Sequence, residues 1–493
     1  MLRSMPTSDP PVPDLPIAGG STSVRRRFSI RLSRPLAFIL TALVLIVVAL
    51  GLRFGLPSIR QQVALQKLRL AGCDCRIERG GPDWLRSRIG YDRTEFFDHV
   101  VEVRCGYSES RDTDFSFLRD LPALRVVDFS DDEENDWEGA LRQLQGNRAL
   151  ERVNLFWTKV TDRGLANLVD CSGLKAIDLF ATSITDDGLK HLAGLTNLEE
   201  LNLSDTRIDG RGVESLRAMS NLRELELAHT AVADVSLPHL QFLGSLERLD
   251  LTDTKIDGSG LESLRPLTKL RQLELHGTLV VSANLAHLRF LEHLEYLGLG
   301  ETRITDDGLS HVSKLRKLQT LNLIEAAVTD ASLQHISGLT ELDSLLLPST
   351  SINGSCFAEL GSLSNLQFLD LSATAITDEN LRHLQLFPKL ARLDLSRTMV
   401  TGNGLKHIAS LRSLSKLDLS HTQITDQEMQ ALAEMGWLED LSLEATPISD
   451  AALKSIARMS GLRSLSLGNT KVTDVGISEL RRGNPRLRHM RGP

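Results

Sequence analysis

The sequence predicts an α/β solenoid of about 16 coils, with a curved parallel β-sheet inside and short helices or 3₁₀ turns outside, preceded by one transmembrane helix. Three observations predict this architecture. One pattern of leucines recurs every 24 residues, a run near the N-terminus carries no charge, and aromatic residues make up only 4% of the 493-residue chain. A hydrophobic fraction of 41% with so few aromatic rings indicates an aliphatic core, which repeat architectures provide.

The uncharged run begins at Leu36 and ends at Leu52, a length at the short end of what crosses a bilayer core. Five arginines lie between residues 25 and 34, whereas only two follow the run closely. This asymmetry predicts a single-pass anchor with a cytoplasmic N-terminus and everything after residue 53 outside the cytoplasm. One alternative is a cleaved signal peptide, which would make the protein secreted, and another is a buried helix of a soluble protein.

The other boundaries follow from composition. Residues 1–35, of which the first 24 are rich in Pro, Ser and Gly, are predicted to form a disordered cytoplasmic tail ahead of the anchor at 36–52. Residues 53–97 are expected to form an N-terminal cap module that seals the first coil. The solenoid then covers residues 98–487, and residues 488–493 form a basic C-terminal tail.

The repeat starts at Leu150 and reads Leu-x-x-Leu-x-Leu-x-x-Thr-x-Ile-x-Asp, with fourteen coils in one phase as far as the coil of Leu462. The Leu-x-Leu unit predicts a short strand whose two leucines point into the coil. The ninth position is Thr in all coils except that of Ala326, and we expect its hydroxyl to bond turn backbone. The thirteenth-position Asp, such as Asp162, is expected to be the N-cap of the convex element that follows. Two irregular coils precede these fourteen.

This pattern resembles the leucine-rich repeat family over roughly residues 98–487, with Thr where the family usually carries Asn. The Thr-Asp-x-Gly-Leu phrase is similar to bacterial membrane-anchored or secreted repeat proteins of unknown role, and also to the repeat domain of F-box substrate receptors. Residues 61–103 resemble the N-terminal module of the first group through Gly81-Pro82-x-Trp84-Leu85. No F-box segment is visible. The resemblance implies a binding platform whose variable strand residues carry function.

Those variable residues occupy the third, fifth, seventh and eighth positions of each repeat, where acids outnumber bases by 15 to 5. Stacked like charges repel one another, so the excess needs a reason. We interpret it as a surface for a basic protein partner, while a solvated face copied from a consensus is the alternative. The net charge of −8 argues against nucleic acid. The fifth-position candidates are Asp178, Glu226, Asp250, Glu274, Asp370, Asp394 and Asp418.

Apolar side chains interrupt this face in two places, and exposed aromatics beside charge are candidates for binding hot spots. The first group either binds a partner or packs under the cap as core: Phe156, Trp157 and Phe180. The second group is expected to form a binding patch, centred on Leu346 and Phe368: Tyr296, Ile324, Leu346 and Phe368.

Cys73, Cys75 and Cys105 are candidates for one disulfide, in which either of the first two bridges to Cys105 and staples the cap. Seven histidines share the eighteenth position of the repeat on the convex side. A copied Lys/Arg-His-Leu phrase explains this column better than a metal or pH-sensing stripe, so no metal site is predicted.

Motifs of hydrolases, metalloproteases and phosphate-binding loops are absent from the sequence, so we expect neither catalysis nor a cofactor. The favoured hypothesis is a non-catalytic, membrane-anchored, extracytoplasmic platform that binds a protein partner. A structural envelope or surface component without a discrete ligand, and a substrate receptor of a ubiquitin-type ligase, are the alternatives. The sequence leaves the ligand and the oligomeric state open.

Overall fold

The computed structural model describes residues 34–50, 56–81, 83–90, 97–106, 114–484 and 486–492. Contacts divide the chain into two units, residues 1–57 and residues 58–493. The expected cytoplasmic tail lies outside the described residues up to residue 33.

The first unit contains helix α1 (Arg34–Leu50). Its 17 residues rise only about 25 Å at ~1.5 Å per residue, whereas the hydrocarbon core of a bilayer is ~30 Å thick. Within the part of the chain that the structure describes, no helix is both long and apolar enough to cross a membrane. The expected transmembrane helix between Leu36 and Leu52 is therefore wrong.

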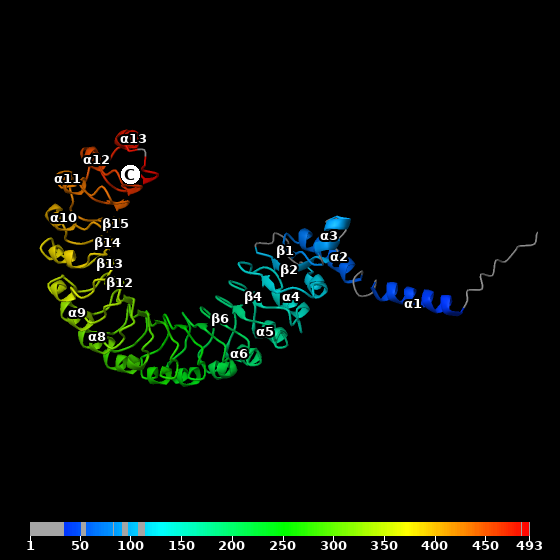
Figure 1. The fold of residues 1–493 in the computed structure, drawn as a ribbon. Helices are drawn as coiled ribbons and strands as arrows, with labels where there is room; N and C mark the ends of the chain where they lie inside the picture. The colour runs from blue at the N-terminus through cyan, green and yellow to red at the C-terminus, as the bar shows by residue number, and fades with distance from the viewer. Residues whose placement is uncertain are drawn as a thin grey trace, which may run out of the picture. The chain divides into compact units, whose positions relative to one another are not determined.

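The second unit is a solenoid built on one 18-stranded sheet (Figure 1). Strand β1 (Asp74–Glu78) pairs antiparallel with β2, and every later strand pairs parallel with its predecessor. The parallel strands are β2 (His99–Arg104), β3 (Val126–Asp128), β4 (Arg152–Asn154), β5 (Ala176–Asp178), β6 (Glu200–Asn202), β7 (Glu224–Glu226), β8 (Arg248–Asp250), β9 (Gln272–Glu274), β10 (Tyr296–Gly298), β11 (Thr320–Asn322), β12 (Ser344–Leu346), β13 (Phe368–Asp370), β14 (Arg392–Asp394), β15 (Lys416–Asp418), β16 (Asp440–Ser442), β17 (Ser464–Ser466) and β18 (His489–Arg491). The last strand lies within the stretch expected to be a basic tail.

Short helices lie on the outer side of the coil stack and the strands line its inner, concave side (Figure 1). The α-helices of this unit are α2 (Leu56–Leu70), α3 (Asp83–Ile89), α4 (Trp137–Gln143), α5 (Asp162–Leu165), α6 (Asp186–Leu192), α7 (Leu237–Leu240), α8 (Asp306–Val312), α9 (Asp330–Ile336), α10 (Gly402–Ile408), α11 (Met429–Leu432), α12 (Asp450–Ile456) and α13 (Asp474–Gly483). The 3₁₀ helices are η3 (Phe115–Asp120), η4 (Ala166–Leu168), η5 (Val213–Ala218), η6 (Asp234–Ser236), η7 (Leu261–Leu264), η8 (Ser282–Phe290), η9 (Phe357–Leu360) and η10 (Asn380–Leu386).

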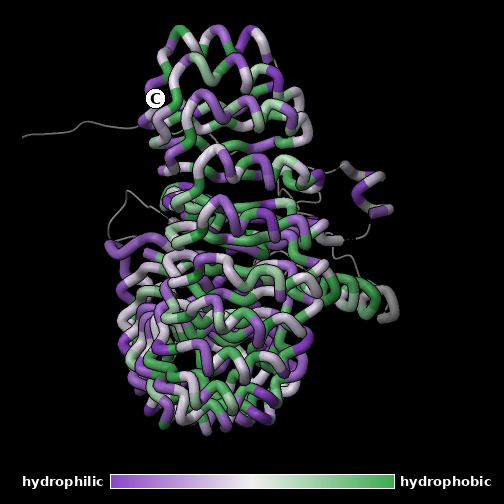
Figure 2. The backbone as a smooth tube through the Cα atoms, turned by 90° about the vertical axis from the view of Figure 1, so that its left-hand side faces the viewer, coloured by the Kyte–Doolittle hydropathy of each residue, from purple (hydrophilic) through white to green (hydrophobic). Residues whose placement is uncertain are grey.

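One coil shows why the strands are three residues long. Leu249 and Leu251 are fully buried between the neighbouring coils, while Arg248 and Asp250 face the concave side. Two residues later the backbone turns through Asp253, whose φ of 51° lies in the left-handed region and ends the strand. Hydrophobic and hydrophilic residues consequently mix along every turn of the solenoid (Figure 2).

The ninth-position threonine closes this turn. The Thr254 hydroxyl is buried and donates to the carbonyl of Leu251 at 2.7 Å, and other coils repeat the bond. The hydroxyl therefore bonds backbone of its own coil, where it satisfies a carbonyl that the strand leaves free.

The thirteenth-position aspartate links coils instead of capping its own helix. Thr185, one residue earlier in the repeat, is the N-cap of α6, and its hydroxyl accepts the Asp187 N–H at 3.3 Å. Asp162 reaches forward to this cap, where its carboxylate accepts the Thr185 N–H at 2.9 Å and the Thr185 hydroxyl at 2.7 Å. The N-cap expectation for Asp162 is corrected accordingly, because the carboxylate finds two donors in the next coil.

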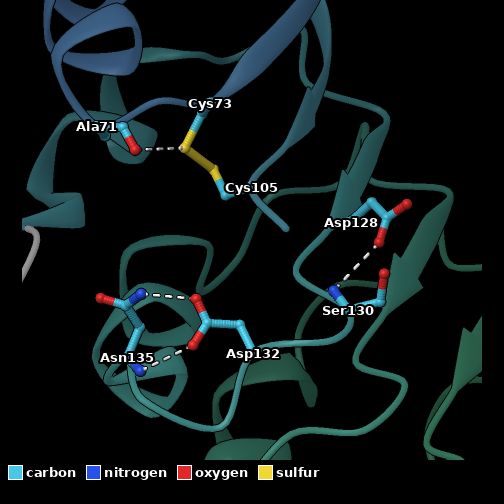
Figure 3. The surroundings of a disulfide bond; sticks show 7 residues. All are labelled: Ala71, Cys73, Cys105, Asp128, Ser130, Asp132 and Asn135. Atoms are coloured by element: carbon cyan, nitrogen blue, oxygen red, sulfur yellow. Dashed lines mark hydrogen bonds between the residues drawn. A yellow bond between two sulfur atoms is a disulfide. The ribbon is translucent and has the colours of Figure 1, made fainter. Parts of the chain in front are cut away.

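The N-terminal cap is joined to the solenoid by a disulfide between Cys73 and Cys105, whose sulfur atoms are 2.06 Å apart (Figure 3). These cysteines follow α2 and β2, while Cys75 is free and half-buried on β1. Beneath them the rings of Phe129 and Trp137 stack at 4.5 Å and are buried. The first coils beside the cap are thus packed around stacked aromatic rings.

Candidate functional site

The parallel register brings the fifth-position residues into one column along the concave face. Glu226, Asp250 and Glu274 lie on adjacent strands, β7 to β9, and form the first acidic run. Three adjacent strands, β13 to β15, carry the second acidic run, whose members are Asp370, Asp394 and Asp418. The remaining candidate, Asp178 on β5, is separated from the first run by the strand of Asn202. The two runs are separated by strands β10 to β12.

Most short fifth-position side chains have a structural task that sequence patterning did not reveal. The carboxylate of Asp394 accepts the N–H of Ser396 at 2.8 Å, which stabilises the turn after β14. Asn202 makes the same bond through its amide oxygen to the N–H of Ser204 at 3.0 Å. The turn therefore needs a short side chain with an oxygen acceptor, but it does not need a charge.

The acidic side chains are partly removed from water. Burial raises the pKa of Glu274 and of Glu226. Burial is also the main cause that raises the pKa of Asp394, and the neighbouring carboxylates of Asp370 and Asp418 raise it further. At neutral pH these carboxylates are harder to keep ionised than free ones, and a cation placed beside them would relieve the cost.

The central apolar patch, defined as Ile324, Leu346 and Phe368, begins between the two acidic runs and extends to β13, the first strand of the second run. Leu346 is the register partner of Asp370, so the patch directly adjoins the second run. All three side chains are half-buried, and the Arg392 guanidinium lies over the Phe368 ring at 5.0 Å from its centroid. An apolar area bordered by charge has the anatomy of a protein-binding hot spot.

At the start of this interval, strand β10 ends in a recess that the sequence analysis missed. A Cβ atom on Gly298 would lie 1.6 Å from Oε2 of Glu274, and one on Gly300 would lie 2.5 Å from Nδ1 of His276. The two glycines of this coil thus leave room for the side chains of Glu274 and His276, which belong to the preceding coil and lie over it. His276 Nε2 lies 3.2 Å from Oε1 of Glu301. The signal in the sequence was the Gly-x-Gly at two positions where most other coils carry side chains.

Tyr296 lies beside this recess on β10, half-buried. Burial is the main cause that raises its pKa, and the adjoining carboxylate of Glu274 raises it further. The phenol is therefore protonated throughout the ordinary pH range, and its hydrogen bond goes to the carboxylate of Glu274. Tyr296 and the central apolar patch lie on nearby strands of the same face.

The N-terminal aromatic group does not pack as core. The rings of Phe156 and Phe180 stack at 4.8 Å with planes 12° apart, and both remain half-buried. Trp157 is 51% exposed and its indole N–H donates to Oε1 of Glu133 at 2.8 Å. These rings follow strands β4 and β5, whereas the central apolar patch lies on the coils of β11 to β13, several strands farther along the sheet.

The histidine column lies where the repeat phase places it. The seven imidazoles are half-buried on the convex side, and the group comprises His191, His239, His287, His311, His335, His383 and His407. In the described part of the chain, no three side chains of His, Cys, Asp or Glu are arranged to hold a metal ion.

A sequence profile described as Leucine Rich repeat matches residues 194–216, 245–264 and 410–433. A search of curated proteins gave no match. Among solved structures, an internalin of Listeria monocytogenes is 20% identical, with 71% of this chain and 88% of that chain covered and a TM-score of 0.47. A leucine-rich repeat protein of Leptospira interrogans is 19% identical, with 84% and 93% covered and a TM-score of 0.49.

The profile matches and the unbroken 24-residue phase show that the chain carries leucine-rich repeats. Proteins with such repeats are in general scaffolds for protein–protein interaction, and their solenoids present extended concave binding surfaces.

Proposed function

We propose that this protein binds a protein partner on its concave face, and that the partner presents an apolar side chain surrounded by basic ones. The observation that carries the proposal is the order of residues along the concave face, where Leu346 is the apolar fifth-position residue between the acidic runs and Ile324 and Phe368 lie on the coils beside it. The first acidic run, the central apolar patch and the second acidic run follow one another on strands β7 to β15. An apolar anchor inside a charged rim excludes water from the contact and selects the partner by charge.

The charge of the column supports a role in binding because the fold does not require it. Asn154, like Asn202, makes the post-strand turn with a neutral amide, at 3.0 Å from the N–H of Phe156. Asp394 makes the same bond, although its ionisation is opposed by burial and by two neighbouring carboxylates. Aspartate therefore adds charge at the expense of stability, which a basic partner would recover on binding.

We further propose that the solenoid works outside the cytoplasm, in an oxidising compartment. The Cys73–Cys105 pairing supports this location, because disulfides persist where thiols are not kept reduced. Cells treated with an alkylating reagent before lysis should yield protein in which both cysteines are protected from the reagent. Full alkylation of both thiols would contradict an oxidising location.

The binding proposal is tested by affinity capture from cell extract with the full chain as bait, at low and at high salt. One variant carries Asp370→Asn, Asp394→Asn and Asp418→Asn, which keep the turn acceptors while they remove the second acidic run. A second variant carries Leu346→Ser. We expect a partner held by the unaltered protein at low salt to be lost at high salt and with either variant.

The matched control neutralises three exposed acids of the convex helices, Asp187→Asn, Asp307→Asn and Glu359→Gln, and so makes the same change in net charge. It should capture the partner as the unaltered protein does. Capture that is equal for all baits would refute the concave-face proposal. Recovery of this chain alone would refute it in favour of a structural assembly.

A further inference from the structure

The concave face widens at its C-terminal end into a hollow of about 880 Å³, which we call the serine bay. Its floor consists of short side chains on β16 and β17, namely Ser442, Ser464 and Ser466. The corresponding strands before it carry long ones, such as Arg392 and Lys416. The hollow beside β13 to β16 is correspondingly smaller, at about 310 Å³.

The walls of the serine bay carry opposite charges. Asp418, Asp440 and Glu444 line the side toward β15, while Arg488 and Arg491 line the side formed by the last coil. The fifth-position register runs from Asp418 through two serines to Arg491. Three strand spacings of ~4.8 Å separate these two residues by about 14 Å, too far for a direct ion pair.

These charges contrast with those on the rim of the coils. There, residues 24 apart pair across neighbouring coils, as Lys317 does with Glu341 at 2.7 Å and Arg463 with Glu439 at 3.1 Å. Among the residues that the structure describes, none of the acids or arginines of the serine bay takes part in an ion pair. The bay thus has three acids on one side of a polar floor and two arginines on the other.

We propose that the serine bay binds the C-terminal end of a peptide chain, with the free carboxylate on the Arg488 and Arg491 side and a cationic side chain on the Asp440 and Glu444 side. Asp440 and Glu444 belong to the coil of β16, two strand spacings or about 10 Å from β18. The first and fourth Cα atoms of an extended segment are also about 10 Å apart at ~3.3 Å per residue. Arginine binds carboxylates through two parallel N–H···O bonds. The serine hydroxyls both donate and accept, so they suit the peptide backbone in between.

This proposal goes beyond the proposed function, because it concerns a smaller ligand held by the coils of β16 to β18, with Asp418 the one residue that the serine bay shares with the second acidic run. The two proposals can fail independently: the serine bay could bind the end of a peptide even if the central apolar patch binds no partner, and the patch could bind a partner even if the bay binds no peptide. The variants that test the two proposals share no residue.

The test is isothermal titration of the full chain with the tetrapeptide Lys-Ala-Ala-Ala and with its C-terminal amide. We expect the free acid to bind at least about ten times more tightly than the amide, because the amide lacks the charge that the arginines face. Arg491→Gln should remove most of this preference. Arg481→Gln, an equal change of charge on the exposed face of α13, should leave it intact.

The cationic end is tested with a peptide in which norleucine replaces lysine. The unaltered protein should prefer lysine, and the double variant Asp440→Asn and Glu444→Gln should not. An acetylated dodecapeptide ending in the same four residues distinguishes the source: equal binding indicates the end of a protein chain, and weaker binding indicates a free short peptide.

Equal affinities for the acid and the amide, no binding of either at about 1 mM, or an unchanged preference in Arg491→Gln would overturn the proposal. Thermal unfolding followed by circular dichroism confirms that each variant is folded before titration.

Discussion

The hydroxyl of Thr185 donates a hydrogen bond to the carboxylate of Asp162, 2.7 Å away and one coil earlier in the chain. The same carboxylate accepts the Thr185 N–H at 2.9 Å. Asp378 and Thr401 repeat the arrangement farther along the solenoid. Consecutive coils are thus joined on the convex side as well as through the sheet.

We expect Asp162→Ala to lower the free energy of unfolding by about 1 to 3 kcal/mol, because two donors of the next coil lose their charged acceptor. Asp162→Asn should cost less, since an amide oxygen still accepts one bond. Chemical denaturation followed by circular dichroism measures both. Asp187→Ala, which removes an exposed carboxylate of the next convex helix, α6, is the control and should change stability by less than about 0.5 kcal/mol.

Ala326 is the one ninth-position residue without a hydroxyl, and it is buried. Ala326→Thr would place a donor beside the carbonyl of Leu323, as Thr302 does for Leu299 at 2.6 Å. We expect a gain of about 0.5 to 1 kcal/mol in the free energy of unfolding, seen as a higher Tm. Ala326→Val has a similar volume and no hydroxyl. If the two variants unfold alike, packing and not the hydrogen bond is responsible.

Asp394→Asn should stabilise the solenoid at neutral pH. The folded protein holds the pKa of Asp394 above its usual value through burial and the carboxylates of Asp370 and Asp418. Stability linked to this group is therefore fully present below the unfolded pKa of ~3.9 and is lost as the pH rises through the folded pKa. The variant should have a Tm about 1 to 2 °C higher at pH 7, because solvent screens part of the repulsion.

The same comparison at pH 3 should show no difference between Asp394→Asn and the unaltered protein. Asp307→Asn, on the exposed surface of α8, serves as the reference at both pH values. A variant that is less stable than the unaltered protein at pH 7 would show that the charge itself holds the turn.

Reduction of the Cys73–Cys105 disulfide should loosen the N-terminal cap and leave the distant coils unchanged. The bond closes a sequence separation of 32 residues, for which a stabilisation of about 2 to 4 kcal/mol is expected. Hydrogen exchange with and without reductant measures the effect by segment. Faster exchange should be confined to the cap and the first coils, because each coil contacts only its neighbours. A uniform increase along the chain would contradict this localisation.

The repeat phase alone predicts most of the fold, because a buried pair such as Leu249 and Leu251 can face the core only as a strand of one coil. It also places the acidic column, whose members are 24 residues apart by construction of the phase. The hydrogen bonds from Thr185 to Asp162 were not predicted, because these residues are 23 positions apart in the sequence and only the stacking of one coil on the next brings them together. The α1 helix was mistaken for an anchor, since its uncharged run is apolar but three residues short of the ~20 that span a bilayer.

The serine bay was invisible to sequence analysis for a different reason. Nothing in the sequence distinguishes the three floor residues, Ser442, Ser464 and Ser466. Only the structure shows that they lie between an acidic wall and a basic wall. Arg491 was assigned to a tail, since Leu487 breaks the 24-residue phase by one position. The sheet continues nevertheless, because β18 pairs with β17 in regular parallel register.

The absence of any insertion between the coils of Leu150 and Leu462 has a genetic consequence. Removal or duplication of 24 consecutive residues within this stretch, wherever the cut falls, restores every column of the repeat and every coil-to-coil bond type. Unequal recombination between two repeats can therefore shorten or lengthen the binding surface by whole coils, and the contacts between the newly joined coils keep their register. The distance between the N-terminal cap and the serine bay is, in this sense, a quantity that evolution can change in steps of one coil.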